Sequence, residues 1–157
     1  MARDSKRGGW RDSVVLLHSV PGAGVHADWM IAPAEPASAD DRVLMTWRLD
    51  EPIGRLLAES PEALGEFDAV RIVDHRSRYL TYEGEVSDGR GTVRRIAEGA
   101  VRMAEEGSHR VVLNIEFTGR VVLKGERVGD APLAADAGDP PLGLWRFRVL
   151  TDDGQGG

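Results

Sequence analysis

Apolar and polar residues alternate with a period of two along most of the chain. In residues 43–49, for example, Val43, Met45, Trp47 and Leu49 share one face. This period is that of a β-strand with one buried face. Comparable short segments, separated by Gly and Pro, occupy residues 14–18, 26–31, 69–74, 111–117, 121–123 and 145–149. The pattern predicts an all-β fold, a small closed or nearly closed β-barrel of about seven to eight strands with at most one or two short helices.

Two stretches depart from this period. Within residues 52–66, Ser60-Pro61-Glu62 offers an N-cap residue and a proline at the first helical position, which predicts one short helix or turn. Residues 92–106 have a composition compatible with a helix, but Gly99 lies in the middle. We therefore expect two strands joined at Glu98-Gly99.

Length and composition fit one globular domain. A chain of 157 residues can bury an ordinary core, and 41% hydrophobic with 29% charged residues is typical of such domains. We expect a barrel domain over residues 13–150, flexible ends at 1–12 and 151–157, and a flexible loop at 126–143. The sequence has neither a long apolar run nor a secretory signal, so we expect a cytoplasmic protein that does not bind membranes.

The absence of cysteine and the uneven charge limit the possible chemistry. Without cysteine there are no disulfides or thiolate ligands, so a metal would need imidazole, carboxylate or backbone oxygen. The formal net charge of −6 argues against a general nucleic-acid coat. Residues 71–95, however, contain six arginines and four acidic residues. Such a basic face can accept one phosphate or a nucleic-acid end, although an ordinary mixed surface explains the charges equally well.

A candidate metal site lies in the first two predicted strands. Alternation places His26, Asp28 and Met30 on one face of strand 26–31. His18 ends the preceding strand, and a hairpin through the turn at residues 21–24 would bring it beside them. Two imidazoles and one carboxylate form a facial set with open positions, which suits Mn, Fe(II) or Zn. A His-x-Asp pair is more often a hydrogen-bonded surface pair, so spacing alone leaves both interpretations open.

Two further groups are candidates for catalysis and anion binding. His75 and Tyr79 are four residues apart, so they share a face in either an extended segment or a helical turn. A histidine beside a phenol can transfer protons and hold phosphate oxygens, but simple packing of the two rings is the alternative. Arg90 lies between two glycines, which allow close approach of an anion, although such loops are usually plain turns. His109, at a strand entrance, is expected to be an ordinary exposed residue.

In their order along the chain, these segments resemble the 3′-phosphoesterase domain of bacterial DNA ligase D (the DNA polymerase/ligase N-terminal domain family), in its short stand-alone form. The counterparts of the family motifs are VVLLH ending at His18, HAD at 26–28, LMTWRL at 44–49, DHRSRY at 74–79, YEG at 82–84 and GRGTV at 89–93. The resemblance covers residues 14 to 150 approximately. It depends on the order and spacing of the motifs rather than on any single one.

The resemblance implies a small β-barrel that binds a divalent metal, commonly Mn, and removes ribonucleotides and phosphate from the 3′ end of a primer strand. It implies His18, His26 and Asp28 as metal ligands, with His75 and Tyr79 as the catalytic residues that contact the phosphate. The implied substrate is a nucleic-acid 3′ end or a small phosphoester. A DNA-repair ligase or polymerase is the implied partner protein.

The sequence departs from the family at the phosphate clamp. Enzymatic members usually carry an arginine two residues after the aspartate, where this chain has Met30. We expect Arg76, Arg78 or Arg90 to replace that arginine as the phosphate-binding residue. If none does, the chain is expected to be a catalytically weak or inactive module that binds a nucleic-acid end or a partner. Unrelated small-molecule chemistry on the same barrel is a third possibility.

Overall fold

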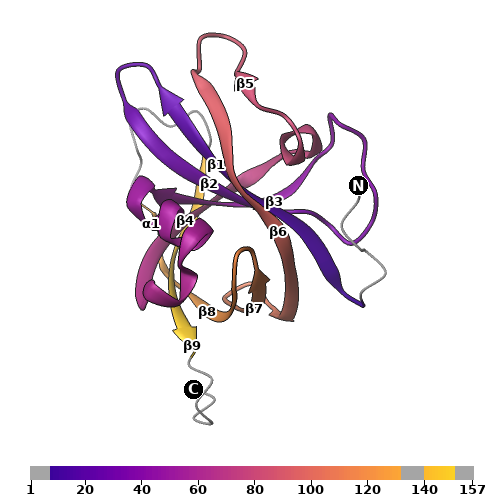
Figure 1. Ribbon diagram of the computed structural model, residues 1–157, viewed down its shortest axis with the longest axis vertical. Helices are drawn as coiled ribbons and strands as arrows, with labels where there is room; N and C mark the ends of the chain where they lie inside the picture. Colours follow the sequence, from indigo (N-terminus) through magenta and orange to yellow (C-terminus); the bar gives the residue numbers. More distant parts are fainter. Residues whose placement is uncertain (1–7, 132–139, 151–157) are drawn as a thin grey trace.

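A computed structural model describes residues 8–131 and 140–150, most of which belong to one antiparallel sheet. One α-helix, α1 (Glu51–Glu59), and two 3-10 turns, η1 (Pro61–Ala63) and η2 (Ser77–Leu80), accompany the strands in this part of the chain (Figure 1). The strands are β1 (Trp10–Val20), β2 (Gly24–Ile31), β3 (Arg42–Asp50), β4 (Glu66–Arg76), β5 (Gly84–Glu85), β6 (Thr92–Glu106), β7 (Arg110–Glu116), β8 (Arg120–Gly129) and β9 (Pro141–Leu150).

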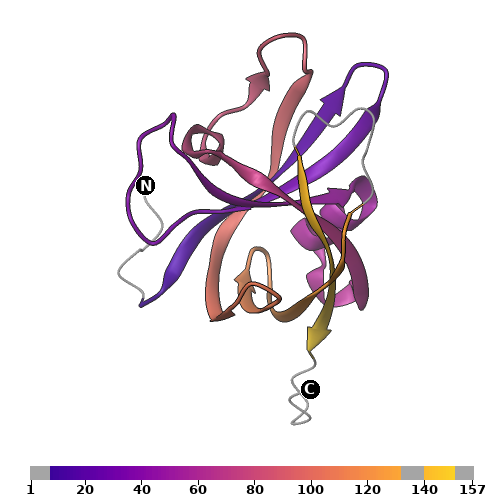
Figure 2. The same ribbon diagram turned by 180° about the vertical axis from the view of Figure 1, so that it is seen from behind.

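Eight of the strands form a nearly closed ring. Their order is β1-β2-β3-β4-β9-β8-β7-β6, and β6 also pairs with β1, which closes the circuit. The short β5 pairs with the beginning of β6 outside this circuit. Seen from both sides, the hairpin of β1 and β2 and the segment that carries β5 extend next to each other from one end of the ring (Figures 1 and 2). The predicted all-β, nearly closed barrel-like fold is confirmed.

The ring encloses a core rich in aromatic side chains. Trp29, Trp47 and Phe147 are fully buried, and their ring centroids lie 5.2–5.7 Å apart. Phe67 stacks on Phe147 at 5.4 Å. These residues occupy inward-facing positions of β2, β3, β4 and β9, so the alternation seen in the sequence directly defines the interior.

Helix α1 packs against the inner side of β2. Pro52 lies in its first turn, where proline is well tolerated, and Leu57 is fully buried in the core. A Cβ atom at position 54 would overlap the side chain of Ala27, so Gly54 permits the close approach of the helix to the strand. The short helix or turn expected at Ser60-Pro61-Glu62 is the 3-10 turn η1. No helix in the described ranges is long and apolar enough to cross a membrane.

Strand β6 is continuous over 15 residues, so the predicted break at Glu98-Gly99 is wrong. The strand pairs with β1 from Thr92 to Arg102 and with β7 from Ala100 onward. A Cβ atom at Gly99 would overlap the backbone oxygen of Glu116. The glycine therefore marks a close backbone approach within a strand rather than a turn.

Two segments that were expected to be flexible contain residues of regular strands. Strand β1 begins at Trp10, inside the expected flexible end at 1–12. Strand β8 continues to Gly129 and β9 begins at Pro141, both inside the expected loop at 126–143. Gly129 pairs with β9, and Pro141 pairs with β4. Residues 132–139 and the expected flexible end at 151–157 lie outside the described residues.

Candidate metal centre

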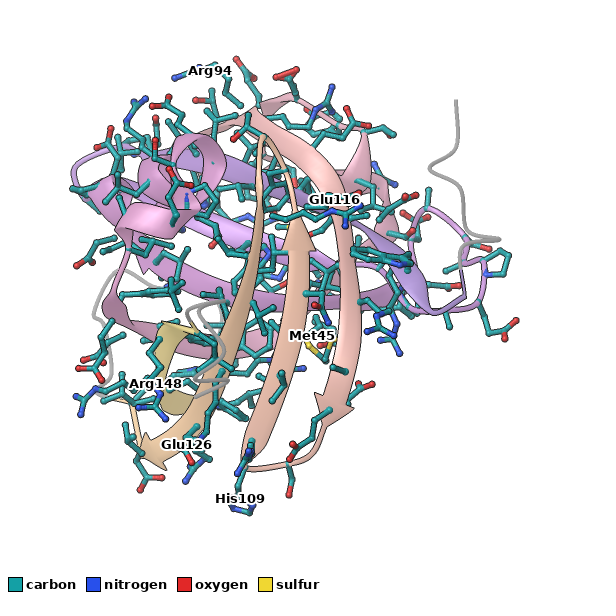
Figure 3. All side chains as sticks on the ribbon, turned by 60° about the horizontal axis from the view of Figure 1, so that its bottom comes forward. Met45, Arg94, His109, Glu116, Glu126 and Arg148 are labelled. Atoms are coloured by element: carbon teal, nitrogen blue, oxygen red, sulfur yellow. The ribbon has the colours of Figure 1, made fainter. Side chains whose placement is uncertain are left out.

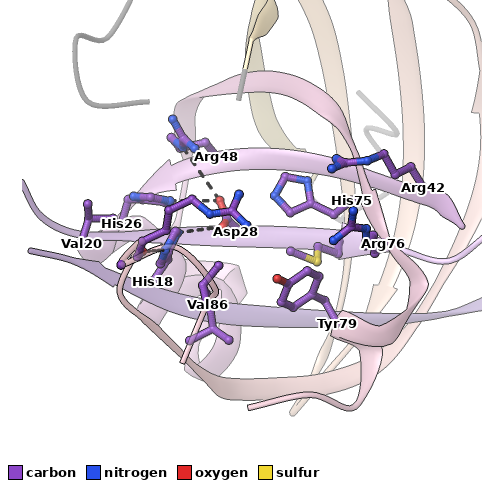
Figure 4. Close-up of a pocket in the computed structure, with 14 residues that line it drawn as sticks. His18, Val20, His26, Asp28, Arg42, Arg48, His75, Arg76, Tyr79 and Val86 are labelled. Atoms are coloured by element: carbon purple, nitrogen blue, oxygen red, sulfur yellow. Dashed lines mark hydrogen bonds and ion pairs between the residues drawn. The ribbon is translucent and has the colours of Figure 1, made fainter. Parts of the chain in front are cut away.

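Strands β1, β2 and β3 have an outer face, which we define as the side turned away from the enclosed core. This face is partly covered by residues 77–93, which comprise η2, β5 and the loop leading into β6. The cover is held by a second apolar cluster, whose buried members are Val14, Leu16, Met30, Ala32, Leu44, Val86 and Val93. Polar side chains of the outer face lie beside this cluster, in a region that the segment only partly shields (Figure 4).

His18, His26 and Asp28 converge on the outer face, as the sequence pattern predicts. His18 and His26 are directly paired across the β1–β2 hairpin, and their ring centroids lie 4.9 Å apart. Nε2 of His26 is 3.3 Å from Oδ1 of Asp28, and Nδ1 of His18 is 3.8 Å from Oδ2 of Asp28. One ligand atom from each residue lies within 4.8 Å of the other two. The three side chains could therefore hold one metal ion.

Two atoms of this cluster are buried without a hydrogen-bond partner among the described residues. They are Nε2 of His26 and Oδ1 of Asp28, and only 2% of Asp28 is exposed. Buried polar atoms without partners are costly, and a buried carboxylate especially so. A cation bound between the two atoms would satisfy both, so the donor set fits a divalent metal with nitrogen and oxygen ligands.

A hydrogen bond orients His18 for metal binding. Its Nε2 lies 2.7 Å from the backbone oxygen of Arg90. Because a carbonyl oxygen can only accept, Nε2 must carry the proton, and Nδ1 directs its lone pair toward Asp28. Burial is the main cause that lowers the pKa of His18, and together with His26 and Arg48 it outweighs the Arg90 carbonyl and Asp28, which raise the pKa. The imidazole is therefore favoured in its neutral, ligating form.

The carboxyl group of Asp28 is held in its anionic form. Burial is the largest single influence and raises its pKa, but the adjacent His26, together with His75 and Arg48, outweighs this effect. The pKa of Asp28 consequently lies below its ordinary value. The cluster therefore provides a buried negative charge next to neutral imidazole nitrogen, as a cation site requires.

A pocket of about 200 Å³ opens beside the cluster (Figure 4). Of the residues predicted to handle phosphate, it brings together His75, Arg76, Tyr79 and Arg90. Arg78 does not line this pocket, and its guanidinium is paired with Asp40 on the surface.

Two arginines of β3, which the sequence pattern does not single out, also line the pocket. Arg48 is directly paired with Asp28 across β2 and β3, and its Nε lies 3.9 Å from the carboxylate. Arg42 lies at the beginning of the same strand. Alternation against the inward-facing Trp47 could have placed Arg48 on the outer face. Its location beside Asp28 follows only from the pairing register of β2 with β3, which the sequence alone does not give.

His75 and Arg76 are consecutive, yet both line the pocket, because β-bulges interrupt the pairing of β3 with β4 at this point. Nδ1 of His75 lies 3.0 Å from the backbone oxygen of Val73. Nδ1 therefore carries a proton, and Nε2 is the nitrogen that can accept another. The turn η2 places the ring of Tyr79 edge-on to that of His75, with centroids 6.1 Å apart.

The loop between β5 and β6 fixes Arg90 at the edge of the pocket. The guanidinium donates hydrogen bonds to the backbone oxygen and the hydroxyl of Ser87, at 2.9 and 3.1 Å. Gly91 has a positive φ of 96°, and a Cβ atom there would overlap the backbone oxygen of Ser19. Only glycine can bring this loop so close to β1, and the approach also places the Arg90 carbonyl on His18.

No family model matches the chain, and no curated protein sequence matches it closely enough to indicate a relationship.

Proposed function

We propose that the protein is a metal-dependent phosphoesterase that removes a 3′-phosphate or a 3′-ribonucleotide from nucleic-acid ends. This is the activity of the ligase D domain that the sequence resembles. The observation that carries the proposal is the convergence of His18, His26 and Asp28 at a pocket lined by arginines. A DNA-repair ligase or polymerase is the proposed partner, since such enzymes use the 3′-hydroxyl that the reaction would leave.

The residues that would hold the metal are His18 through Nδ1, His26 through Nε2 and Asp28 through its carboxylate. Mn²⁺ is the proposed ion, and Zn²⁺ also suits these donors. When bound, such an ion would polarise a phosphoryl oxygen and lower the pKa of a coordinated water. Because the Arg90 carbonyl orients His18 and the hairpin fixes His26, the donors are arranged in advance of binding.

The arginines would position the phosphate and balance its charge. Arg48 lies next to Asp28 and provides, from β3, a guanidinium near the position where the resembled family has its clamp on β2. Arg90, whose backbone oxygen contacts His18, also lines the pocket from the glycine loop. Fixed cations in a partly enclosed site stabilise the charge that develops on a transferring phosphoryl group.

His75 and Tyr79 would handle the protons. Because Nδ1 of His75 donates to the Val73 carbonyl, its Nε2 can take a proton from an attacking water or return one to the leaving oxygen. The Tyr79 hydroxyl is drawn toward the pocket in Figure 4 and can donate a hydrogen bond to a phosphate oxygen. The two residues lie close together, because His75 is near the end of β4 and Tyr79 is in the turn η2 that follows it.

A second candidate function is binding without efficient catalysis. It is favoured by Met30, which has 1% exposure and packs in the apolar cluster of the outer face. The position at which the resembled family has its phosphate-binding arginine is thus occupied by a buried apolar side chain in this protein. If Arg48 does not replace the clamp, the pocket would hold a nucleic-acid end or a partner and turn it over slowly.

The test is an end-processing assay on 5′-labelled oligonucleotides that end in a 3′-phosphate or in one 3′-ribonucleotide, with Mn²⁺, Zn²⁺ or EDTA. The wild type should produce a 3′-hydroxyl strand with metal and none in EDTA. His26→Ala and His75→Gln should each reduce the rate by about 10²-fold or more. His109→Gln is the matched control, because His109 is exposed at the β6–β7 hairpin (Figure 3).

The outcomes separate the two candidate functions. Activity that requires the metal and both pocket histidines, but not His109, supports the phosphoesterase. A wild type that binds the strands but leaves them unchanged with every metal supports the binding module. Activity that survives His26→Ala would contradict the assigned metal site.

A further inference from the structure

The pocket has a second cationic end, made by Arg42 and Arg76. The two residues are direct partners in the register of β3 with β4, and both line the pocket. In Figure 4 they lie on the far side of His75 from His18, His26 and Arg48. Like charges directly opposite each other across two strands are destabilising. An anion bound between or beside the two guanidinium groups would therefore stabilise this pair.

No carboxylate of the described residues supplies that anion. The three acidic groups nearest in sequence are engaged elsewhere: Asp40 pairs with Arg78, and Asp74 pairs with Arg71 at 3.1 Å. The carboxylate of Asp41 accepts a hydrogen bond from the backbone N–H of Ser38. Within the described ranges, neither the Arg42 side chain nor the Arg76 side chain has a hydrogen bond or ion pair.

The backbone holds the two arginines in place. The N–H of Ser77 donates to the backbone oxygen of Asp41 at 2.8 Å, and the N–H of Arg78 donates to that of Ala39 at 2.9 Å. These bonds join the loop before β3 to the turn after β4. The opposed positions of Arg42 and Arg76 are thus fixed by the fold rather than by chance encounter of two long side chains.

The two cationic ends are too far apart for one phosphate. Arg48 is opposite Asp28, and Arg42 is six positions away on β3, or about 20 Å along the strand at roughly 3.3 Å per residue. A single phosphate held at the metal cluster cannot also contact Arg42. A nucleic-acid strand can contact both, because it carries a phosphate at every nucleotide. The ring of Tyr79 lines the pocket as well and offers a surface on which a base can stack.

We propose that Arg42 and Arg76 form a second anion subsite, which holds a backbone phosphate of the strand whose 3′ end lies at the metal cluster. This inference rests on the proposed function and names what the pocket selects: a nucleic-acid strand rather than a small phosphomonoester. The subsite sets affinity and substrate choice, whereas the cluster with Arg48 and His75 performs the chemistry.

The binding test uses a fluorescein-labelled single-stranded DNA dodecamer with a 3′-hydroxyl, titrated by anisotropy in Mn²⁺. Arg42→Gln and Arg76→Gln should each weaken binding by about tenfold, and Arg42→Lys should retain most of it. In the double variant, the slope of log affinity against log salt should fall by about 0.7, the value of one single-strand phosphate. Arg78→Gln is the matched control, because Arg78 is a neighbour already paired with Asp40.

The turnover test compares a dodecamer 3′-phosphate with thymidine 3′-monophosphate, which has no second phosphate. Arg42→Gln and Arg76→Gln should lower kcat/KM for the dodecamer by about tenfold and leave the mononucleotide unchanged. Equal losses on both substrates would place these arginines at the reacting phosphate and overturn the subsite. So would a wild type without measurable strand binding, or strand binding insensitive to both substitutions.

The two tests distinguish a failed subsite from a failed function. If no substrate is turned over but strand binding depends on Arg42 and Arg76, the subsite stands and the phosphoesterase does not. If turnover depends on the metal while strand binding ignores both arginines, the phosphoesterase stands and the subsite does not.

Discussion

Strand β2 presents two faces that differ in almost every physical respect. Its inner residues Ala27, Trp29 and Ile31 are fully buried in the aromatic core of the ring. Of its outer residues, Asp28 is buried and His26 is partly buried, and each leaves a buried polar atom without a hydrogen-bond partner among the described residues. Alternation therefore gives the two faces of β2 different roles. The inner face stabilises the fold, whereas the outer face carries an energetic cost that a bound cation would offset.

One side chain connects the two faces. The Ser13 hydroxyl accepts a hydrogen bond from the indole of Trp29 at 3.1 Å and donates one to the backbone oxygen of Met30 at 2.7 Å. Ser13 is fully buried, so both bonds are shielded from water. The aromatic core thereby fixes the part of β2 that carries the outer-face ligands, and damage to the core should spread to the site. Damage to the site should not spread to the core.

The largest effect on stability is expected from a substitution in the aromatic core, on the inner face of the neighbouring strand β3. Trp47→Ala removes a fully buried indole that packs on Trp29 and Phe147, and should lower the free energy of unfolding by about 3–5 kcal/mol. Urea denaturation followed by circular dichroism measures it. Leu142→Ala serves as control, since Leu142 is 51% exposed and should change stability by no more than about 0.5 kcal/mol. Similar losses in both variants would contradict the described core.

The second effect is stabilisation by metal. At about 100 times the dissociation constant, Mn²⁺ should raise the free energy of unfolding by about 2.7 kcal/mol, because the ligands converge only in the folded chain. The protein should keep its strand signal in EDTA, since its core does not depend on the ion. His26→Ala should abolish the stabilisation while changing metal-free stability by less than about 1 kcal/mol. Melting curves with and without Mn²⁺ decide this, and unfolding in EDTA would make the metal structural.

A smaller loss is expected from Gly99→Ala, on the β6 strand that closes the ring. The added methyl group would collide with the Glu116 carbonyl, and the strain should cost about 1–3 kcal/mol. Gly119→Ala is the control, because a Cβ atom at Gly119 meets nothing within 4 Å. The melting temperatures of the two variants are the measurement. Equal values would show that β6 and β7 do not approach as closely as described.

The parts of the site that sequence could predict are those fixed by local geometry. His18, His26 and Asp28 come from one hairpin and one alternation, and His75 and Tyr79 are separated by a single turn. The same local rules could not place Arg48, because its position beside Asp28 depends on how β3 pairs with β2 after a ten-residue connection. Strand register decides which residues distant in the sequence become neighbours, and the pattern of apolar and polar residues does not specify that register.

The incorrect prediction of a break in β6 has an equally specific cause. Gly99 was interpreted as a turn because a glycine within an ambiguous stretch has the same local signature in a turn and in a close strand crossing. The fold class was predictable because alternation and turn residues are repeated along the whole chain. The exact extent of β6 and β8 was not, since it is decided by pairing with strands distant in sequence.

The most direct test of whether the outer face of β2 binds a cation is to locate a bound metal ion. Crystals soaked in Mn²⁺ should give a single strong anomalous peak on the outer face, in contact with Nδ1 of His18, Nε2 of His26 and the carboxylate of Asp28. The same experiment on His26→Ala should lose the peak while the aromatic core remains in place. An anomalous peak elsewhere, or none at millimolar Mn²⁺, would contradict the claim that the outer face of β2 is built to hold a cation.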